Sequence, residues 1–337
     1  MTAAALEVED LVIRFAGRDR RLQVVDGISF TVGRGEIVAV VGESGCGKTV
    51  TAMATVGLLP AVAEVQATAI RVGGKDVYPF DQTTLQQVRG KAVGFVFQEP
   101  LRALNPAMRI GRQLQEVTAR HLRLSRQEEN RRVIEYLDLV GIPHAEQVAR
   151  MYPHEISGGM RQRVLIAAAI ICEPVLLIAD EPTTALDVTI QAGILELLRE
   201  LRQTKQLSML LVSHELGVVA DMADRVLVMY AGRVVEAAAV DDVFARPAHP
   251  YTQALLNAIP TRTSARLVEI PGSVPTFDQS QTSCAFAPRC ARSTDRCTSH
   301  VPGLGEFATA HRVACFHPGP DAARSGLSRS DGSRAAP

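Results

Sequence analysis

The chain of 337 residues contains no tryptophan, and aromatic residues make up only 4% of it. So few rings argue against the stacking platforms that bind single-stranded nucleic acid. Positive charge is not in excess either, because 36 Lys and Arg residues balance 36 Asp and Glu residues. A general nucleic-acid binder needs a basic surface that displaces phosphate counterions. We therefore expect no nucleic-acid partner.

Long apolar runs are also missing. The longest, residues 164–172, is far shorter than the roughly 20 residues that a membrane-spanning helix needs. The first residues, MTAAALEVED, lack the basic start and apolar stretch of a signal peptide. We expect a cytosolic chain of roughly two or three domains, so that any membrane work is done by another polypeptide.

Cysteine is scarce and unevenly placed. Cys46 and Cys172 are isolated, whereas the other four cysteines gather near the C-terminus: Cys284, Cys290, Cys297 and Cys315. In a reducing cytosol, such a cluster favours a metal site over disulfides.

Strand-like and helix-like patterns alternate from residue 5 to about residue 240. Residues 5–41 alternate apolar and polar residues, with turns at Gly17 and at residues 33–35, and predict strands. The apolar runs EIVAVV, VLLIAD, SMLLVS and RVLVMY predict buried strands separated by helices. Residues 105–160 are mainly helical, with a capping box from Ser125 to Glu128. The pattern predicts an α/β fold with a mainly parallel sheet covered on both faces.

The amino-acid composition changes near residue 240, where prolines become frequent and apolar runs shorten. We expect a nucleotide-binding domain at 1–240, with a helical subdomain at about 100–160, and a smaller cysteine-containing domain at 241–320. Residues 321–337 are small and polar and are predicted to be disordered.

A phosphate-binding motif follows the strand EIVAVV. Residues 42–49, GESGCGKT, fit the pattern G-x-x-x-x-G-K-[ST] and run into a helical segment. The glycines let the backbone wrap around phosphates, and the helix N-terminus faces the same anion. Lys48 would reach the β- and γ-phosphates and Thr49 would bind Mg²⁺ through its hydroxyl. We interpret Cys46 as a small filler at a crowded turn. The predicted nucleotide-binding residues here are Gly42, Ser44, Gly45, Cys46, Gly47, Lys48, Thr49 and Val50.

Two acidic residues end the strand VLLIAD, namely Asp180 and Glu181. Ligands of open parallel sheets sit at the carboxyl ends of strands. Asp180 is then placed to hold Mg²⁺, directly or through water, and Glu181 to polarise an attacking water. The alternative is a solvated acidic turn.

The ordered set of motifs resembles the nucleotide-binding subunit of ATP-binding cassette (ABC) transporters over about residues 5–240. The set comprises the phosphate loop, Gln98 after a strand, residues 157–160 (SGGM) at a helix start, the acidic pair, residues 185–187 (ALD), and His214 after a strand. The resemblance implies an ATPase with a RecA-like core, an antiparallel β subdomain and a helical subdomain.

The resemblance also implies roles for single residues. Phe15 matches the aromatic residue that stacks on adenine, although Tyr is commoner there. Gln98 matches the residue that contacts Mg²⁺ and the attacking water and senses the membrane subunit, and His214 the contact to the γ-phosphate. Ser157, Gly158, Gly159 and Met160 match the signature that closes on the ATP of the opposite subunit. Asp187 matches the loop at the interface between the two subunits. A second subunit would then close on the triphosphate with its helix N-terminus, and hydrolysis would release it. Ile156 departs from the usual Leu.

Further stretches are similar to the ATPases of di- and oligopeptide importers, a group that includes nickel importers. They are residues 97–106, 249–256 and 270–275 and the run Cys-x-Phe-x-Pro-Arg-Cys from residue 284, so the resemblance reaches about residue 318. It implies ATP and Mg²⁺, a second ATPase subunit, two membrane permeases, an extracytoplasmic binding protein and a peripheral place on the cytoplasmic face of the membrane. Nickel import, or a soluble cassette ATPase of DNA repair or translation, remains an alternative.

The spacing of the cysteine cluster is Cys284-x5-Cys290-x6-Cys297-x17-Cys315. These gaps fit poorly with the tight C-x2-4-C pairs of structural zinc sites. Four cysteines can hold a [4Fe–4S] cluster, and the subfamily resemblance implies such a cluster in some members. Zinc, with His300, His311 or His317 as a substitute ligand, and free thiols or disulfides are the alternatives.

Overall fold

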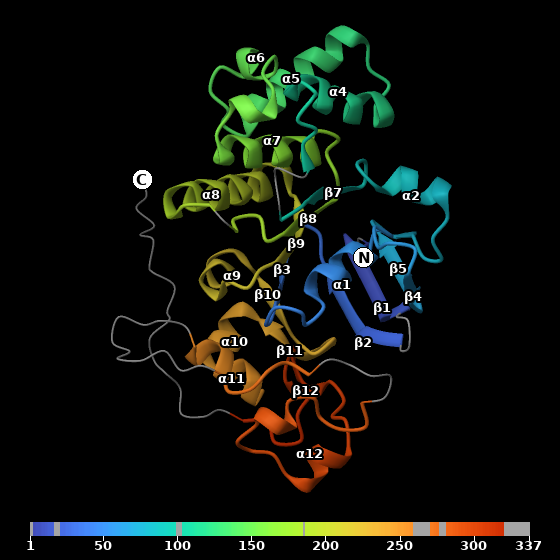
Figure 1. Cartoon of the computed structure of the whole chain (residues 1–337), viewed down its shortest axis with the longest axis vertical. Coiled ribbons are helices and arrows are strands. Elements are labelled where there is room, and N and C mark those ends of the chain that lie inside the picture. Colours follow the sequence, from blue (N-terminus) through green and yellow to red (C-terminus); the bar gives the residue numbers. More distant parts are fainter. Residues whose placement is uncertain are drawn as a thin grey trace.

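The computed structural model describes residues 3–16, 21–98, 103–184, 186–258, 270–275 and 281–319. The predictions for Gly17, Ala185 and the tail 321–337, and for part of the 97–106 stretch, lie outside these residues. No helix in the described ranges is long and apolar enough to cross a membrane. In Figure 1 a helical region lies at one end of the molecule, two sheets lie in the middle and the C-terminal region lies at the other end.

The larger sheet has eight strands in the order β12-β13-β11-β10-β3-β9-β8-β7. Its middle strands are parallel, and β3, β8 and β9 are buried at every position, which is why they read as unbroken apolar runs. The predicted parallel sheet is confirmed. Its parallel strands are β3 (Ile37–Val41), β7 (Val93–Val96), β8 (Leu176–Asp180), β9 (Ser208–Val212) and β10 (Arg225–Tyr230). An antiparallel edge consists of β11 (Arg233–Ala239), β12 (Gly305–Ala308) and β13 (His311–Val313).

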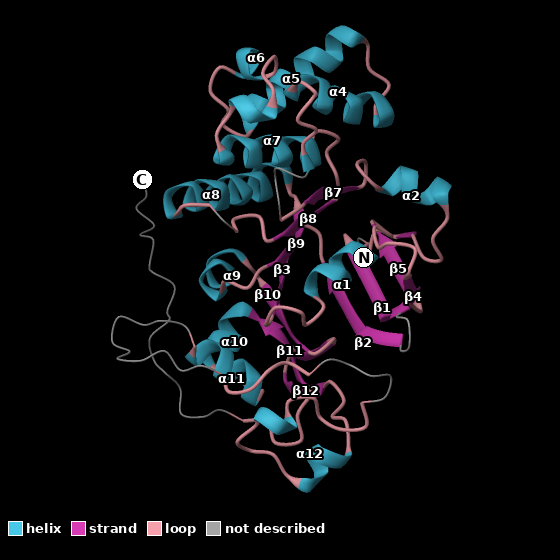
Figure 2. Cartoon of the chain, viewed as in Figure 1, coloured by secondary structure: helices cyan, strands magenta, loops and turns pink. Residues whose placement is uncertain are grey.

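The smaller sheet is antiparallel and covers one face of the larger one. Its strands are β1 (Leu6–Ala16), β2 (Arg21–Val32), β4 (Ala63–Gln66), β5 (Ala69–Val72) and β6 (Lys75–Asp76). Successive residues of β3 face opposite ways, so that Val38 and Val40 join the core under this sheet and Ile37 and Ala39 join the core under the helices. Helix α1 (Lys48–Ala54) lies on the same side as the smaller sheet (Figure 2). Helix α2 (Gln82–Val88) leads into β7.

The helical region consists of α4 (Ile110–His121), α5 (Arg126–Leu139), α6 (Ala145–Val148), the 3-10 turn η1 (Pro153–Glu155) and α7 (Gly158–Ile170). The capping box of α5 is confirmed, because the Ser125 N–H donates to a Glu128 carboxylate oxygen at 2.7 Å and the Glu128 N–H donates to the Ser125 hydroxyl at 3.4 Å. The other face of the larger sheet is covered by α8 (Val188–Lys205), α9 (Leu216–Met222) and α10 (Val240–Ala245), beside α11 (Pro250–Asn257) (Figure 1).

The C-terminal region adds the 3-10 turn η2 (Ala287–Arg289), helix α12 (Asp295–Ser299) and strands β12 and β13. Strand β13 pairs with β11, so this region extends the sheet of the nucleotide-binding part. Buried Glu236 on β11 strengthens the join. Its carboxylate accepts the N–H groups of Ala248 and His249 at 2.8 and 2.9 Å and contacts Nε2 of buried His311 at 2.7 Å. A buried carboxylate with three partners fixes the region to the sheet.

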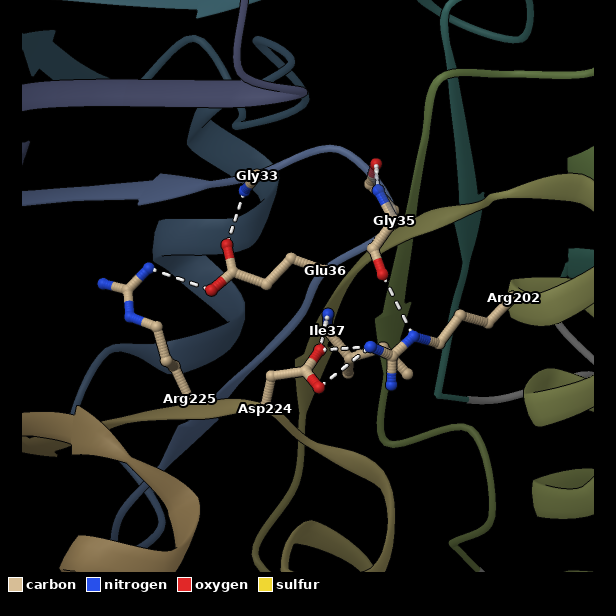
Figure 3. Close-up of polar contacts among 8 residues, drawn as sticks. Gly33, Gly35, Glu36, Ile37, Arg202, Asp224 and Arg225 are labelled. Atoms are coloured by element: carbon tan, nitrogen blue, oxygen red, sulfur yellow. Dashed lines mark hydrogen bonds and ion pairs between the residues drawn. The ribbon is translucent and has the colours of Figure 1, made fainter. Parts of the chain in front are cut away.

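A polar network fixes the start of β3, at the opposite end from the phosphate motif (Figure 3). Asp224, just before β10, accepts two bonds from the Arg202 guanidinium of α8 at 2.7 and 2.8 Å and one from the Ile37 N–H at 2.8 Å. Arg202 also donates to the Gly35 carbonyl at 3.0 Å. The network therefore ties β3, β10 and α8 together at one point.

We expect Asp224→Ala to lower the free energy of unfolding by about 1–3 kcal/mol, because it leaves the Ile37 N–H without its acceptor and removes two of the bonds of the Arg202 guanidinium. Urea unfolding followed by circular dichroism measures the change. The matched control is Asp221→Ala, which breaks the more exposed pair of Asp221 with Arg199 and should cost less than about 1 kcal/mol. Equal unfolding midpoints for the two variants would contradict the role given to Asp224.

Candidate active site

The phosphate motif forms a tight loop between β3 and α1. Gly42 has φ 152°, and a Cβ there would lie 2.2 Å from the Met229 carbonyl oxygen, while a Cβ on Gly47, at φ 103°, would lie 2.9 Å from the Val24 carbonyl oxygen. These two positions therefore need glycine. Ser44 and Gly45 are exposed at the tip of the loop. The loop thus keeps its backbone accessible where a phosphate would approach.

Lys48 is 6% exposed and its Nζ donates to the carbonyl oxygens of Gly42 and Glu43 at 2.8 and 3.0 Å. The ammonium group is thus held inside the loop by weak neutral acceptors. Anionic phosphate oxygens would be stronger acceptors. Cys46 is fully buried and burial raises the pKa of its thiol, which suits a neutral filler.

Thr49 and Asp180 meet at the base of the loop. The Thr49 hydroxyl donates to a carboxylate oxygen of Asp180, the last residue of β8, at 3.0 Å. Burial of Asp180, with a smaller contribution from the neighbouring Glu181 charge, raises its pKa to about 6. A hydroxyl and a carboxylate are hard oxygen ligands of the kind that Mg²⁺ prefers. The two side chains therefore fit the predicted Mg²⁺ site.

Three side chains contact Glu181, which itself directly follows β8. Its carboxylate accepts Gln98 Nε2, which follows β7, at 2.6 Å and the Thr184 hydroxyl at 2.9 Å. Nδ1 of His214, which follows β9, lies 3.1 Å from the other carboxylate oxygen. Glu181 itself has φ 47°, which turns its side chain out of the strand direction. The predicted Gln98, Glu181 and His214 are therefore brought together, and Thr184 is a partner that the motifs did not indicate.

The glycine turn at residues 157–160 lies in the helical region, at the start of α7. The Ser157 hydroxyl accepts the Met160 N–H at 3.3 Å and caps the helix. Gly158 is exposed, and a Cβ there would meet no atom within 4 Å, whereas a Cβ on Gly159 would lie 2.7 Å from Ile190 of α8. The helix thus presents an open N-terminus on the surface. In Figure 1, α7 lies in the helical region, apart from α1.

The remaining predicted residues lie on separate elements. Asp187 is exposed and caps α8, accepting the N–H groups of Thr189 and Ile190 at 3.1 and 3.0 Å. Phe15 lies on β1 opposite Leu22 and Ala63 and is half-buried. Val50 is half-buried on α1. The contact of Phe15 with adenine stays a prediction, as do the roles of residues 157–160 and Asp187.

The four C-terminal cysteines line one small cavity, together with Phe286, Phe316 and His317. None forms a disulfide. Burial raises the pKa of the Cys284, Cys290 and Cys315 thiols, and Cys315 Sγ accepts the His317 N–H at 3.3 Å. Within the described ranges, no three His, Cys, Asp or Glu side chains are grouped so that they could hold a metal ion. The cysteines gather as expected, and the iron–sulfur cluster stays a prediction.

A parallel sheet with a phosphate loop, an oxygen pair for Mg²⁺ and a glutamate contacted by Gln98 and His214 defines an ATP-hydrolysing protein. Comparison with known proteins specifies it further. Residues 25–184 match the ABC transporter family model, and residues 235–297 match the model of the oligopeptide/dipeptide transporter C-terminal region.

Among curated proteins, the chain is 46% identical over 314 residues to the oligopeptide transport ATP-binding protein AppD of Bacillus subtilis, covering 92% of this chain and 96% of AppD. It is 44% identical over 320 residues to the probable peptide ABC transporter ATP-binding protein y4tR of Sinorhizobium fredii, with 92% and 94% covered. A solved dimeric structure of the ATP-binding cassette MJ0796 with ADP and Pi covers 70% of this chain and 98% of its own, with a TM-score of 0.62 and 23% identity, and shares the fold. The chain therefore belongs to the ATP-binding proteins of ABC transporters, in the oligopeptide/dipeptide group, and it is an ATPase.

Proposed function

We propose that this ATPase energises the import of di- or oligopeptides through separate membrane permeases. The observation that carries the chemistry is the meeting of Gln98, Glu181 and His214 beside the loop that holds Lys48 and Thr49. The match of the C-terminal region to oligopeptide transporters and the names of the relatives support the substrate class.

The chain's own groups account for the hydrolysis of ATP. Lys48 exchanges its two loop carbonyls for phosphate oxygens and neutralises charge that spreads over the phosphate in the transition state. Thr49 and Asp180 would hold Mg²⁺, which adds to that neutralisation when bound, and Gln98 is the third ligand that we propose. Glu181 accepts a proton from the attacking water. Gln98 and His214, whose side chains are exposed beside Glu181, orient the water and the γ-phosphate.

A second ATPase subunit completes the site in this proposal. The exposed turn at Ser157 and Gly158 begins a helix of 13 residues, so its free N–H groups and dipole can face the phosphates bound by the other subunit. Exposed Asp187 at the start of α8 would lie at the same interface. We propose a peripheral place on the cytoplasmic face of the membrane, beneath two permeases that receive peptide from an extracytoplasmic binding protein.

The helical region is the proposed permease contact. Two open cavities of about 740 and 820 Å³ lie on it; residues of α5 and α6 line both, and residues of α4 line the second. A photo-reactive amino acid at Arg109, which lines both, should cross-link to a permease in the assembled transporter. The control position is Glu306 on β12, exposed in the C-terminal region, which should give no permease adduct. Adducts from Glu306 alone would contradict this contact.

The substrate class is tested with the reconstituted transporter. ATP-dependent uptake of labelled di- and oligopeptides into proteoliposomes should occur, and excess Ni²⁺ should not compete. Uptake of Ni²⁺ without peptide uptake would favour the nickel alternative. Purification of the chain with ribosomes or DNA, and without permeases, would favour a soluble cassette factor of translation or repair.

We also propose that Cys284, Cys290, Cys297 and Cys315 hold a [4Fe–4S] cluster. Their convergence on one cavity supports a shared ligand. The wide spacing of the four cysteines fits poorly with the tight C-x2-4-C pairs of structural zinc sites. A cluster is a larger object and takes four thiolates. Its expected role is to hold together a loop-rich region poor in apolar residues.

A further inference from the structure

The phosphate loop is held from outside the cassette motifs through one residue, Glu43. Its carboxylate accepts both terminal nitrogens of Arg289, at 2.7 and 3.0 Å, in a bidentate pair. Its backbone N–H donates to the Tyr251 hydroxyl at 2.8 Å. Arg289 belongs to η2 and Tyr251 to α11. Both partners therefore lie C-terminal to residue 240, and this part of the chain is called the C-terminal region below. Glu43, the second residue of the phosphate loop, is thus held both by its side chain and by its backbone.

The partners of Glu43 are themselves firmly placed. The Arg289 side chain is 5% exposed and also donates to the carbonyl oxygens of Ile270 and Pro271, at 3.1 and 2.7 Å. Tyr251 is fully buried, and its ring packs against those of Tyr230 and Phe286 with centroids 4.6 and 5.5 Å apart. The Arg289 guanidinium, with its fixed acceptors, and the buried cluster of Tyr230, Tyr251 and Phe286 therefore form a well-packed contact for the loop.

The charge of Glu43 makes this contact important for nucleotide binding. The Glu43 carbonyl oxygen accepts a bond from the Lys48 ammonium at 3.0 Å, so the Glu43 carboxylate belongs to a residue in direct contact with the group that would bind the β- and γ-phosphates. An unpaired carboxylate there would repel a triphosphate and compete for Lys48. The bidentate pair with Arg289 neutralises the carboxylate. None of the cassette motifs supplies this cation.

We propose that Arg289 is a positioning residue of the ATP site, through which the C-terminal region holds the phosphate loop in its nucleotide-binding shape. Arg289 does not touch the nucleotide. It acts through Glu43, by cancelling the charge of the carboxylate, while the Tyr251 hydroxyl holds the backbone of the same residue. The C-terminal region is then part of the ATPase machinery, in addition to any role in transport.

The test is the ATPase activity of the full chain carrying Arg289→Ala, with nucleotide affinity measured by titration with a fluorescent ATP analogue. Loss of one partner of a largely buried pair should raise the KM for ATP and the Kd of the analogue about tenfold. The kcat should change by less than about threefold, because Glu181, Gln98 and His214 are untouched. Arg289→Lys keeps the cation without the fork and should give an intermediate KM.

A second variant separates positioning from mere packing. In Glu43→Ala/Arg289→Ala, no carboxylate remains unpaired, so the KM should return to within about threefold of the wild-type value. The matched control is Arg292→Ala in the same segment, whose guanidinium contacts the Gly319 carbonyl and Gln253; its KM should not change. A wild-type KM in Arg289→Ala, or no recovery in the double variant, would overturn the proposal. If Arg289→Ala is insoluble, Arg289→Gln removes the cation while keeping a polar side chain, and a wild-type KM in that variant would overturn the proposal as well.

Discussion

Replacement of Glu181 by Gln is expected to lower the rate of ATP hydrolysis by about 10²-fold or more, while ATP still binds. The substitution keeps the shape of the side chain but removes the carboxylate that accepts a proton from water. One amide oxygen can still accept the bonds from Gln98 and Thr184, which reach the same carboxylate oxygen in the wild-type protein. The site should therefore stay assembled but lack its base.

The same substitution should also change how two ATPase subunits associate. If ATP holds two subunits together and hydrolysis releases them, the Glu181→Gln variant should accumulate as an ATP-bound dimer. Size-exclusion chromatography with light scattering, in MgATP and in MgADP, measures the dimer fraction, and phosphate release measures turnover. A dimer that forms equally well with MgADP would contradict the role of the γ-phosphate.

Lys48→Ala is the matched control for that experiment. It removes the ammonium group that lies inside the phosphate loop, so it should weaken nucleotide binding itself and give no ATP-bound dimer. The two variants thus separate loss of binding from loss of chemistry. Near-normal turnover by Glu181→Gln would remove Glu181 from the role of base.

The parts of the fold and site that the sequence predicted are those encoded locally. The phosphate loop is specified by residues within one stretch of the chain, and the capping box of α5 by two residues three positions apart. The buried parallel strands are visible because burial on both faces selects unbroken apolar runs. The strand-end position of Glu181 followed from its place after an apolar run, whereas the roles of Gln98 and His214 were implied by the resemblance to ABC ATPases.

The parts that could not be predicted depend on pairs distant in sequence. Glu43 and Arg289 are separated by 246 positions, and no periodicity links them. Strand β12 is exposed at every residue and β13 has only three residues, so neither carries an apolar pattern that would show it joining the larger sheet. Thr184 lies in the turn that follows Glu181, whose φ is 47°, and no sequence pattern marks this hydroxyl as a partner of the carboxylate.

Anaerobically purified protein is expected to be brown and to carry about four irons per chain, the stoichiometry of a [4Fe–4S] cluster. Burial raises the pKa of the Cys284, Cys290 and Cys315 thiols above its usual value, which favours their protonated forms. Binding of the cluster must therefore displace their protons, and the gain from thiolate bonds becomes folding free energy for the C-terminal region.

Cys290→Ser should bleach the protein, lower its iron content and make residues 281–319 sensitive to limited proteolysis, because it removes one of four ligands. The matched control is Cys172→Ser, a buried cysteine outside this cavity, which should keep colour and iron. A colourless anaerobic preparation with one zinc per chain would decide for zinc, and a colourless, metal-free preparation for simple thiols. Cys290 directly follows Arg289, so the KM for ATP of Cys290→Ser adds a second readout. A raised KM in Cys290→Ser, with a normal KM in Cys172→Ser, is expected if loss of the cluster also loosens the contact between Arg289 and Glu43.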